Sequence, residues 1–561
     1  MINNLQRNLR LIPSVAKRLV SVPDLSSPSL SSLRRGATHV ASALVLALVV
    51  GSPNATRAAT FTWSGDSSTN QLWSNGANWA GIAPLSSNTT DLVFAGTTNT
   101  GTSGSPLNND IATPFVLNSI TFNSGGGAFF LGGTSLQFSA GLNDTITQSS
   151  SSAETIANTI TASGKPLNNT ETITLTGNGS GVVTLSGTIL AGNGQRDYAI
   201  TKSGTSTYVL SGANTYGGAT TVSTGILNIQ NNTALGGTGS GTSVASGATL
   251  QIQNGITVGA EGLTLNGTGA TGQNGALVNV SGTNNYGGLV TLGSATTISS
   301  DSGTLNLTNT GTITGSGNAL TLTGSGDGSV SSVIGTGAGT LTKSGSGSWT
   351  LTGASTYSGG TTVSAGTLFV NNTIGSGTGT GTVTVNGTGT LGGSGTITGA
   401  VNVSASSAKI NAGGTAGAVG TLATGALTLS SASVMSVDMT STTADQISVT
   451  GAVNITSASL QLNIPNGTVF TAGQSFTLIN NDLADAISGT FSNAPTGTDL
   501  IDGYYWVVAY NGGTGNDFVI TAVPEPSTWL AAALALGAIG FAQRKRLRAC
   551  ASSAVEKHSN F

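Results

Sequence analysis

One stretch of sequence occurs twice in this chain of 561 residues, and that repeat limits the possible folds more than any other feature. Residues 200–232 and residues 341–373 align without a gap at an offset of 141 residues, and about half of the positions are identical. Most shared positions are Gly, Thr or apolar residues, which are poor acids, bases and metal ligands, so the repeat predicts an architectural unit. Its matched positions are Lys202 and Lys343, Leu210 and Leu351, Tyr216 and Tyr357, Gly218 and Gly359, and Gly225 and Gly366.

Short strands separated by tight turns are predicted throughout the body of the chain. In the stretch GTVTVNGTGTL, Val383 and Val385 would point inward, and Thr382 and Thr384 outward. Gly or Ser interrupts such runs after three to five residues. Strands of this kind admit a sandwich array or a solenoid. The even, charge-poor rungs favour an all-β fold, an elongated right-handed parallel β-solenoid (β-helix) with terminal caps.

Charged residues are few and unevenly distributed. They make up 7% of the chain, and between Thr60 and Val523 five basic residues stand against 17 acidic ones, which leaves no basic surface for nucleic acid. The only histidines and the only cysteine are His39, His558 and Cys550, all near the ends. The body therefore cannot form a disulfide, a Cys/His zinc site or a Ser-His-Asp centre, and we expect no metal and no cofactor.

The N-terminus is typical of an export signal. A long basic region precedes the apolar run VASALVLALVVG at residues 40–51, which is short for a membrane span. Small residues follow, and they predict cleavage after Ala58 or Ala59. We assign residues 1–58 to a signal peptide that enters the general secretory translocon, with a short membrane anchor as the alternative.

The C-terminus combines three features in order. Residues 523–527 read VPEPS, an apolar helix is predicted over residues 528–542, and a basic cluster occupies residues 544–548. A helix of this length spans about 22 Å, less than the roughly 30 Å of a bilayer core, so it would be a weak anchor. The motif residues are Val523, Pro524, Glu525, Pro526 and Ser527, and the cluster residues are Arg544, Lys545, Arg546 and Arg548.

Residues 523–549 resemble the PEP-CTERM sorting signal of Gram-negative bacteria. The resemblance implies recognition and processing by a membrane-embedded exosortase. It also implies a transient inner-membrane intermediate, in which the basic cluster stops translocation, followed by release of the protein. The tail after residue 549 is longer than this family usually has.

The body resembles a second family. Both copies contain the Lys-Ser-Gly, Thr-Tyr-x-Gly and Thr-Thr-Val elements of the autotransporter-associated β-strand repeat. The segments FTWSGDSSTNQLWSNGANW, GYYWVVAY and GGTGNDFVIT resemble the opening and closing segments of such proteins. The resemblance implies a passenger-like solenoid, in which we expect the sorting signal to take the place of the translocator barrel after Thr521.

Aromatic residues near both ends of the body have two interpretations. Trp63, Trp73 and Trp79 could stack on sugar rings, but we expect them to plug the end of the solenoid, where strand edges would otherwise be unpaired. Tyr504, Tyr505 and Trp506 suggest the same arrangement at the other end.

Few residues are candidates for chemistry. Asp517 lies in GGTGNDFVI, one copy of a calcium-binding nonapeptide, but that site needs stacked copies, so a hairpin turn is expected instead. The acid pairs Asp482/Asp485 and Asp499/Asp502 could in principle serve glycoside hydrolysis. They lie in loop-like sequence, and we predict no catalytic residue.

These observations predict a non-enzymatic, exported β-solenoid with a structural or adhesin-like role at the cell surface or in the extracellular matrix. The alternatives are a lyase or glycosidase, or a glycan- or calcium-binding module, on the same scaffold. A lyase needs a basic catalytic residue, and Arg196, the only arginine of the body, has no acidic cluster beside it in sequence. Expected partners are the translocon, the inner membrane and an exosortase-type enzyme. Extracellular polysaccharide is a further candidate, and nucleic acid is not expected.

The predicted organisation has five parts. They are the signal peptide (1–58), an N-terminal cap with the first coils (59–165), the solenoid with both copies (166–400), the last coils and a cap (401–522), and the sorting signal (523–549).

Overall fold

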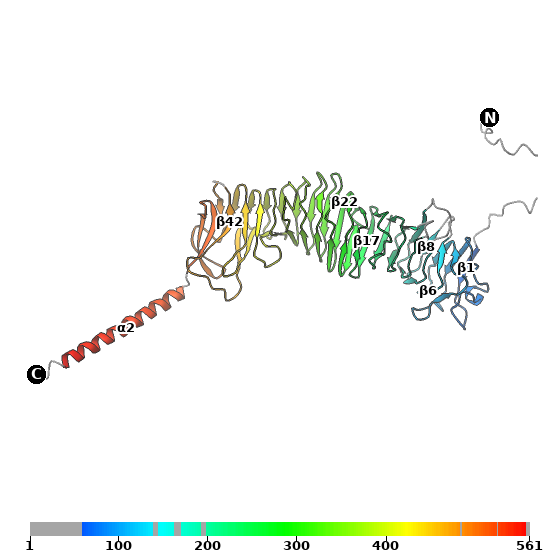
Figure 1. Ribbon diagram of the computed structural model, residues 1–561, viewed down its shortest axis with the longest axis horizontal. Helices are drawn as coiled ribbons and strands as arrows, with labels where there is room; N and C mark the ends of the chain where they lie inside the picture. Colours follow the sequence, from blue (N-terminus) through cyan, green and yellow to red (C-terminus); the bar gives the residue numbers. More distant parts are fainter. Residues whose placement is uncertain are drawn as a thin grey trace, which may run out of the picture. The chain divides into compact units, whose positions relative to one another are not determined.

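The fold comes from a computed structural model that describes residues 59–138, 144–161, 170–191, 198–482, 485–523 and 526–556, with helical side chains at the C-terminus described at 534–549. These residues form 46 strands, a short 3-10 helix η1 (Gly76–Trp79) and one helix α2 (Pro526–Glu556) (Figure 1). The predicted signal peptide lies outside the described residues.

Almost every strand pairs in parallel with a strand of the next coil, which makes a parallel β-solenoid of about 15 turns. This confirms the predicted all-β solenoid. Most strands have three to five residues in a buried–intermediate–buried pattern, as the alternating sequence predicted. Three parallel ladders run along the stack, and we call them the first, second and third ladder.

The first ladder contains these strands: β1 (Ala59–Trp63), β2 (Thr90–Phe94), β5 (Ser119–Phe122), β8 (Thr145–Gln148), β10 (Glu171–Gly177), β12 (Tyr198–Lys202), β14 (Thr220–Val222), β16 (Thr242–Val244), β19 (Leu263–Gly267), β22 (Val290–Ser300), β24 (Thr312–Thr314) and β27 (Val333–Gly335).

The second ladder contains these strands: β3 (Leu107–Asn109), β6 (Phe130–Gly133), β9 (Glu154–Ile156), β11 (Val182–Leu185), β13 (Thr207–Leu210), β15 (Gly225–Ile229), β17 (Ala248–Gln253), β20 (Leu277–Ser281), β22 again, β25 (Leu320–Thr323), β28 (Leu341–Lys343), β30 (Thr361–Val363), β32 (Val383–Val385), β34 (Val401–Val403), β37 (Leu427–Leu429), β40 (Val453–Thr456) and β43 (Ser488–Thr490).

The third ladder contains these strands: β18 (Thr257–Val258), β21 (Thr283–Tyr286), β23 (Thr304–Leu307), β26 (Asp327–Val330), β29 (Ser348–Leu351), β31 (Thr367–Val370), β33 (Thr390–Gly392), β35 (Lys409–Asn411), β38 (Val434–Asp438) and β41 (Ser459–Asn463). A separate pair near the start is β4 (Phe115–Leu117) with β7 (Leu136–Phe138).

The long strand β22 belongs to two ladders. Its first residues, from Val290, pair with β19, and its last residues, around Ile298, pair with β20 and β25. This one strand joins the first two ladders into a single 28-stranded sheet, whereas the third ladder is a separate 10-stranded sheet.

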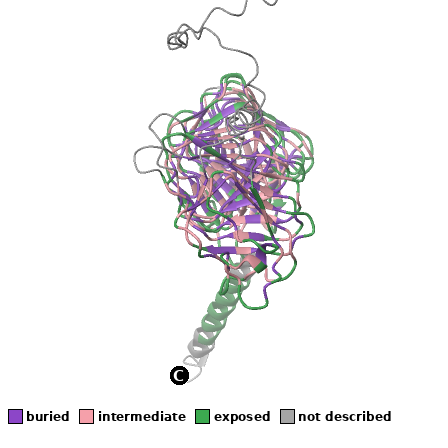
Figure 2. Ribbon diagram, turned by 90° about the vertical axis from the view of Figure 1, so that its right-hand side faces the viewer, coloured by how far each residue is buried: buried purple, intermediate pink, exposed green. Residues whose placement is uncertain are grey.

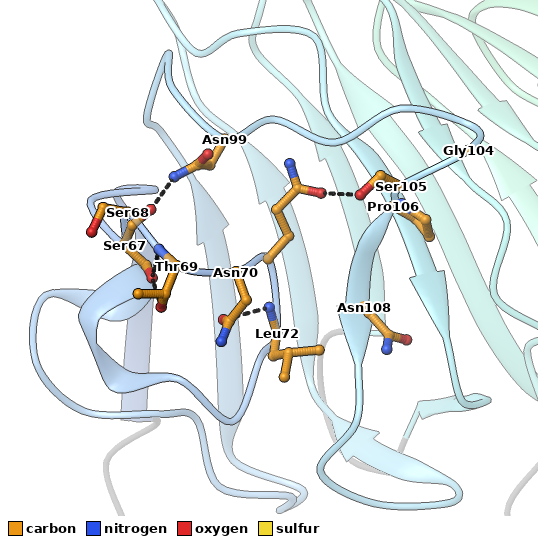
Figure 3. A pocket seen from close by; sticks show the side chains of 11 residues that line it. Ser67, Ser68, Thr69, Asn70, Leu72, Asn99, Gly104, Ser105, Pro106 and Asn108 are labelled. Carbon is orange, nitrogen blue, oxygen red and sulfur yellow. Dashed lines mark hydrogen bonds between the residues drawn. The ribbon is translucent and has the colours of Figure 1, made fainter.

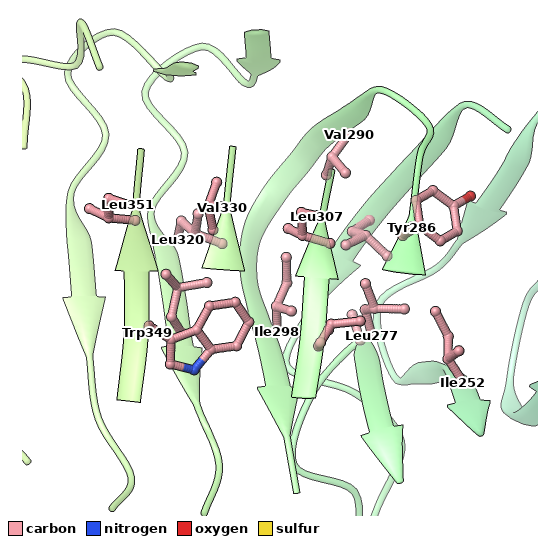
Figure 4. Close-up of a cluster of buried hydrophobic side chains, with 14 of the residues drawn as sticks. Ile252, Leu277, Tyr286, Val290, Ile298, Leu307, Leu320, Val330, Trp349 and Leu351 are labelled. Atoms are coloured by element: carbon pink, nitrogen blue, oxygen red, sulfur yellow. The ribbon is translucent and has the colours of Figure 1, made fainter. Parts of the chain in front are cut away.

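The core is built from columns of inward side chains, one from each coil. In the second ladder, Leu250, Leu277, Ile298 and Leu322 lie in register and are fully buried. Figure 4 shows part of this core, with Trp349 of the third ladder beside it. Burying each such side chain contributes about 1.5–3 kcal/mol. Figure 2 shows the buried residues along the strands and the exposed residues mainly on the connecting loops and α2.

Threonines form matching columns on the outside. Thr321, Thr342, Thr362 and Thr384 pair in consecutive coils of the second ladder, between the inward positions. This is the outward Thr arrangement that the alternating sequence predicted.

The C-terminal part of the stack ends in an antiparallel extension. A six-stranded sheet comprises β36 (Thr421–Thr424), β39 (Gln446–Val449), β42 (Ser475–Asn481), β46 (Asp517–Ala522), β45 (Tyr504–Gly512) and β44 (Gly497–Ile501). The first three pair in parallel, whereas β42, β46, β45 and β44 pair antiparallel. The hairpins cover the edge that a parallel stack would leave open.

Candidate functional site

Lys202 and Lys343 are fully buried at equivalent places in the two sequence copies, each at the end of a strand. The Nζ of Lys202 donates to the carbonyl oxygens of Ser203 and Gly204 at 2.8 and 2.9 Å. It also donates to the carbonyl oxygen of Thr224, one coil further on, at 3.1 Å. The lysine therefore ties the turn of its own coil to the turn of the next.

The second copy repeats this arrangement atom by atom. The Nζ of Lys343 donates to the carbonyl oxygens of Ser344 at 2.7 Å, Gly345 at 2.9 Å and Ala365 at 3.0 Å. A lysine ammonium has three donors, so both ammonium groups are fully satisfied without a carboxylate. We call each arrangement a lysine turn: residues 202–204 with 224–225, and residues 343–345 with 365–366.

Each lysine turn requires a glycine on the adjacent coil. Gly225 and Gly366 have φ of +71° and +62°, in the region that favours glycine. A Cβ at Gly366 would lie 2.3 Å from the carbonyl oxygen of Gly347 and 2.7 Å from the Nζ of Lys343. The glycine therefore supplies both the backbone conformation and the space for the ammonium group, as its matched position predicted.

The other matched positions also have packing roles. Leu210 and Leu351 are buried in their ladders. Tyr216 is fully buried, and its hydroxyl lies 2.7 Å from the Oγ1 of Thr220; Tyr357 repeats this contact with Thr361 at 2.5 Å. Burial raises the pKa of both phenols well above the ordinary value, so they are poor proton donors. At Gly218 and Gly359, a Cβ would lie within 2.4 Å of a carbonyl oxygen of the preceding coil.

Burial also sets the protonation of the two lysines. It lowers the pKa of Lys202 to about 8, and it lowers that of Lys343 to about 8 although the nearby Asp327 carboxylate acts in the opposite direction. Both amines therefore remain mostly charged at pH 7. Each ammonium group already donates to three carbonyl oxygens and therefore has no donor left for a substrate, so the lysine turns are structural rather than reactive.

The two copies occupy different ladders. Lys202 ends β12 in the first ladder, whereas Lys343 ends β28 in the second. The following strand shifts in the same way, from β13 in the second ladder to β29 in the third. Along the first ladder the chain completes six turns from β12 to β27 before β28 begins. The sequence offset is thus six turns plus one face, and the repeated sequence specifies a turn that fits more than one face.

The three N-terminal tryptophans form one buried cluster. Trp63 and Trp73 are fully buried and Trp79 nearly so. The rings of Trp63 and Trp79 meet edge-to-face at a centroid distance of 5.1 Å, and those of Trp73 and Trp79 at 5.7 Å. Phe94 and Phe115 extend the cluster. Because their faces are covered, these tryptophans fill the interior of the first coils and are not a sugar-stacking platform.

The C-terminal aromatic residues lie on β45. Trp506 is fully buried against Phe470 at a centroid distance of 5.0 Å, whereas Tyr505 is 38% exposed. Asp517 is buried where β45 turns into β46, and its carboxylate accepts from the backbone N–H groups of Asn481 and Thr514, both at 2.9 Å. This carboxylate locks the hairpin turn, as the turn interpretation of GGTGNDFVI expected.

The predicted acid pairs lie at separate places in this C-terminal extension. Asp482 directly follows β42. Residues 483 and 484, which separate it from Asp485, are outside the described residues. Asp499 is on β44, and the carboxylate of Asp502 accepts from the backbone N–H of Leu462 at 2.6 Å. Among the described residues, no group of three or more His, Cys, Asp or Glu side chains is placed to hold a metal ion. Arg196 lies outside the described residues.

Buried acids were not predicted from the sequence. Glu154 is 1% exposed on β9, and its Oε2 accepts from the backbone N–H of Phe129 at 2.6 Å. Burial raises its pKa to about 7 against the opposing effect of that hydrogen bond. Burial likewise raises the pKa of Asp445 to about 7, although its carboxylate accepts from the N–H groups of Gly420 and Asp438, both at 2.8 Å. Glu154 and Glu171 occupy inward positions of strands whose sequences alternate like those of the other coils. An acidic residue at an inward position was therefore the only sequence signal for these buried acids.

The sorting segment begins where the last strand ends. The backbone N–H of Val523 donates to the carbonyl oxygen of Tyr505 at 3.0 Å, which holds the start of the segment on β45. Pro524 and Glu525 lie outside the described residues, and Pro526 and Ser527 start α2, where proline is favoured in the first turn.

Helix α2 corrects the predicted helix bounds of 528–542. It runs from Pro526 to Glu556 and includes the basic cluster, because Arg, Lys, Leu and Ala are good helix formers and nothing in the stretch ends the helix. Arg544, Lys545, Arg546 and Arg548 are exposed on it. Within the part of the chain that the structure describes, no helix has both the length and the apolar character of a membrane span.

The fold and these segments define a class of protein, a repeat-built parallel β-solenoid followed by a C-terminal sorting segment. Comparison with protein families gives two matches: residues 200–229 and 341–368 match the passenger-associated-transport repeat, and residues 522–546 match the PEP-CTERM protein-sorting motif. No curated protein matches the chain. The matches confirm both resemblances, and together with the solenoid they indicate an exported protein of a Gram-negative bacterium.

Proposed function

We propose that this protein is a non-enzymatic, structural or adhesin-like β-solenoid that an exosortase-type enzyme processes on its way to the cell surface or the extracellular matrix. The observation that carries the proposal is the position of the sorting motif. It starts at residue 522, the last residue of β46, so a completed solenoid is followed directly by the sorting segment.

The residues that could do chemistry support a structural role. The two buried lysines are saturated by carbonyl oxygens. Asp445, Asp502 and Asp517 accept hydrogen bonds from backbone N–H groups, which is how carboxylates fix turns. A glycosidase would need two carboxyl groups facing a substrate cleft, and these three are committed to the backbone.

The processing step is tested with two epitope tags, one after Thr60 and one after Phe561, in a host that has an exosortase. We expect surface or medium fractions to contain the first tag and to lack the second. Recovery of both tags on one full-length chain in those fractions would contradict processing.

Glu525→Ala tests the sorting motif itself. This variant should be exported but should accumulate as a precursor in the inner membrane. Glu556→Ala, at the end of α2, removes the same charge outside the motif and is the matched control, so its release should be normal. If Glu525→Ala is released as efficiently as the native chain, residues 523–527 are only a spacer and not a recognition motif.

A further inference from the structure

A pocket of about 730 Å³ opens beside the N-terminal tryptophan cluster, and its volume is in the range of small-molecule sites. Two loops and one strand form it: residues 67–72 between β1 and η1, residues 99–106 between β2 and β3, and Asn108 on β3 (Figure 3). Every lining residue is uncharged, and most carry a hydroxyl or a carboxamide.

The walls of the pocket are held in place by hydrogen bonds. The Nδ2 of Asn99 donates to the carbonyl oxygens of Gly65 and Ser67 at 2.6 and 2.5 Å, which ties the second loop to the first. Across the pocket, the Oγ of Ser105 donates to the Oε1 of Gln71 at 2.9 Å. The backbone N–H of Asn108 donates to the carbonyl oxygen of Gln71 at 3.0 Å. The loops are thus ordered before any ligand arrives, which lowers the entropic cost of binding.

Several polar groups are left over from this network. Within the described residues, the Nε2 of Gln71 and the Nδ2 of Asn108 make no hydrogen bond to the protein, and the Oδ1 of Asn108 lies against Gly133 of the next coil, where an added Cβ would come within 2.2 Å of it. A carboxamide offers a donor and an acceptor side by side, which matches two neighbouring hydroxyl groups that each donate and accept. Leu72 and Pro106 add apolar surface to the same lining.

Charge narrows the ligand class further. A phosphate, a carboxylate or a cation would need an opposite charge or a metal to offset the loss of its hydration, and the lining supplies none. A purely apolar ligand would leave the free carboxamides unpaired. The chemistry that fits is a neutral polyhydroxylated molecule.

We propose that this pocket binds an uncharged sugar segment of an extracellular polysaccharide, with Gln71 and Asn108 as its main hydrogen-bonding residues. The inference rests on the proposed function, because it requires the solenoid to reach polysaccharide outside the cell. The binding test below uses purified protein and does not depend on sorting. Failure of sugar binding and failure of exosortase processing can therefore be told apart.

Calorimetric titration of the purified full-length chain provides the test. The neutral probes are the hexasaccharides of cellulose, amylose, mannan and xylan, and the anionic comparison is hexagalacturonate. We expect at least one neutral probe to bind and hexagalacturonate to bind more weakly or not at all. If no neutral probe binds at millimolar concentration, or if hexagalacturonate binds best, the proposal is overturned.

Two variants locate the binding. Asn108→Asp keeps the shape of the side chain but replaces its Nδ2 donor with an oxygen. Gln71→Ala removes the other free donor, the Nε2 of Gln71. Each should weaken binding about tenfold or more, as expected for the loss of at least one hydrogen bond. Thr264→Val, in a hydroxyl-lined hollow of about 400 Å³ in the middle of the stack, is the control and should bind normally. Equal binding by Asn108→Asp and the native chain, with circular dichroism unchanged, would refute the assignment.

Discussion

At the scale of single residues, the most informative side chains are buried and charged. A buried lysine normally needs a carboxylate, because transfer of an unpaired charge from water is costly. Lys202 instead donates all three of its N–H groups to carbonyl oxygens in the turns of two successive coils. The Gly204 oxygen also accepts from the Oγ1 of Thr224 at 3.2 Å, so the lysine is a second donor to this oxygen and supplies a donor to the oxygens of Ser203 and Thr224. The lysine is therefore the donor that the turn geometry requires.

The first prediction concerns this lysine. Lys202→Met keeps the length of the side chain but removes its donors, so three carbonyl oxygens lose a partner. We expect a local loss of stability of about 2 kcal/mol, because each unsatisfied acceptor costs roughly 1–3 kcal/mol and the gain from no longer burying a charge offsets part of it. Hydrogen exchange at residues 203–206 and 224–226 measures the effect. Lys409→Met, at a half-buried position on β35, is the control and should leave local exchange unchanged. If both variants exchange alike, the lysine turn does not stabilise the stack.

The second prediction concerns pH and Glu154. Burial raises the pKa of this group to about 7 from 4.5, so between these values the folded state holds the proton more tightly than the unfolded state. The contribution of this group to stability is therefore complete below pH 4.5 and is lost as the pH rises through 7. Between pH 5 and pH 8 the loss is on the order of 2–3 kcal/mol, since about two pKa units of the shift fall within that window and one unit corresponds to about 1.4 kcal/mol. Hydrogen exchange of β9 and β11 at pH 5 and pH 8 tests this.

Glu154→Gln removes the titrating group, so the opening free energies of β9 and β11 should become independent of pH once the exchange rates are corrected for the intrinsic pH dependence of amide exchange. The region around Asp445, whose pKa is also raised to about 7, should keep its pH dependence in the same variant and serves as an internal control. A native chain that is equally stable at pH 5 and pH 8 near β9 would show that the Glu154 carboxylate is solvated.

At the scale of elements, the turn between two strands decides where a strand can lie. In the lysine turn, Gly366 supplies a positive φ and also leaves room for a carbonyl oxygen and the ammonium group. These two roles can be separated experimentally, because Gly317 has a similar φ of +74° with nothing within 4 Å of its missing Cβ.

The third prediction uses this pair. Gly317→Ala should cost about 1–2 kcal/mol, the strain of a left-handed alanine alone. Gly366→Ala should cost about 1–3 kcal/mol more, because its Cβ would clash with the Gly347 oxygen and the Lys343 Nζ. Chemical denaturation followed by circular dichroism compares the two. Equal costs would mean that the neighbouring coil yields and that only φ matters at Gly366.

Sequence patterns predicted the elements better than their arrangement. The period of two and the recurring glycines identified inward pairs such as Val383 and Val385, because these signals are local. The ladder of each strand was not predictable, because it depends on how many turns separate two segments, and turn lengths vary. β22, which serves two ladders, has no sequence feature that marks it as different. The N-terminal pocket was missed for the same reason, since its two loops meet only when β1 and β2 pair.

At the scale of the whole molecule, the one-face shift between the two copies shows that neighbouring coils matter more than position in the stack. Each strand pairs with the strand of the coil before and the coil after, so stability is approximately a sum of coil terms and interface terms. A solenoid built this way should tolerate changes in the number of coils, provided that each face stays in register.

The last prediction tests this property with two deletions. Val383 and Val401 are direct register partners, so deletion of residues 383–400 removes one coil and lets β34 pair with β30 in place of β32. Deletion of residues 383–389 removes only β32 and rotates every later strand by one face. The shorter deletion should then be the more damaging. A Cβ at Gly393 would lie only 2.1 Å from the carbonyl oxygen of Val370, so this position needs glycine, and the rotation would move Gly393 away from that oxygen. Thermal unfolding and limited proteolysis should show a small loss of stability for the longer deletion and a large one for the shorter. If the shorter deletion is tolerated as well as the longer, register between faces does not constrain the stack, and the shift between the two repeat copies carries no structural information.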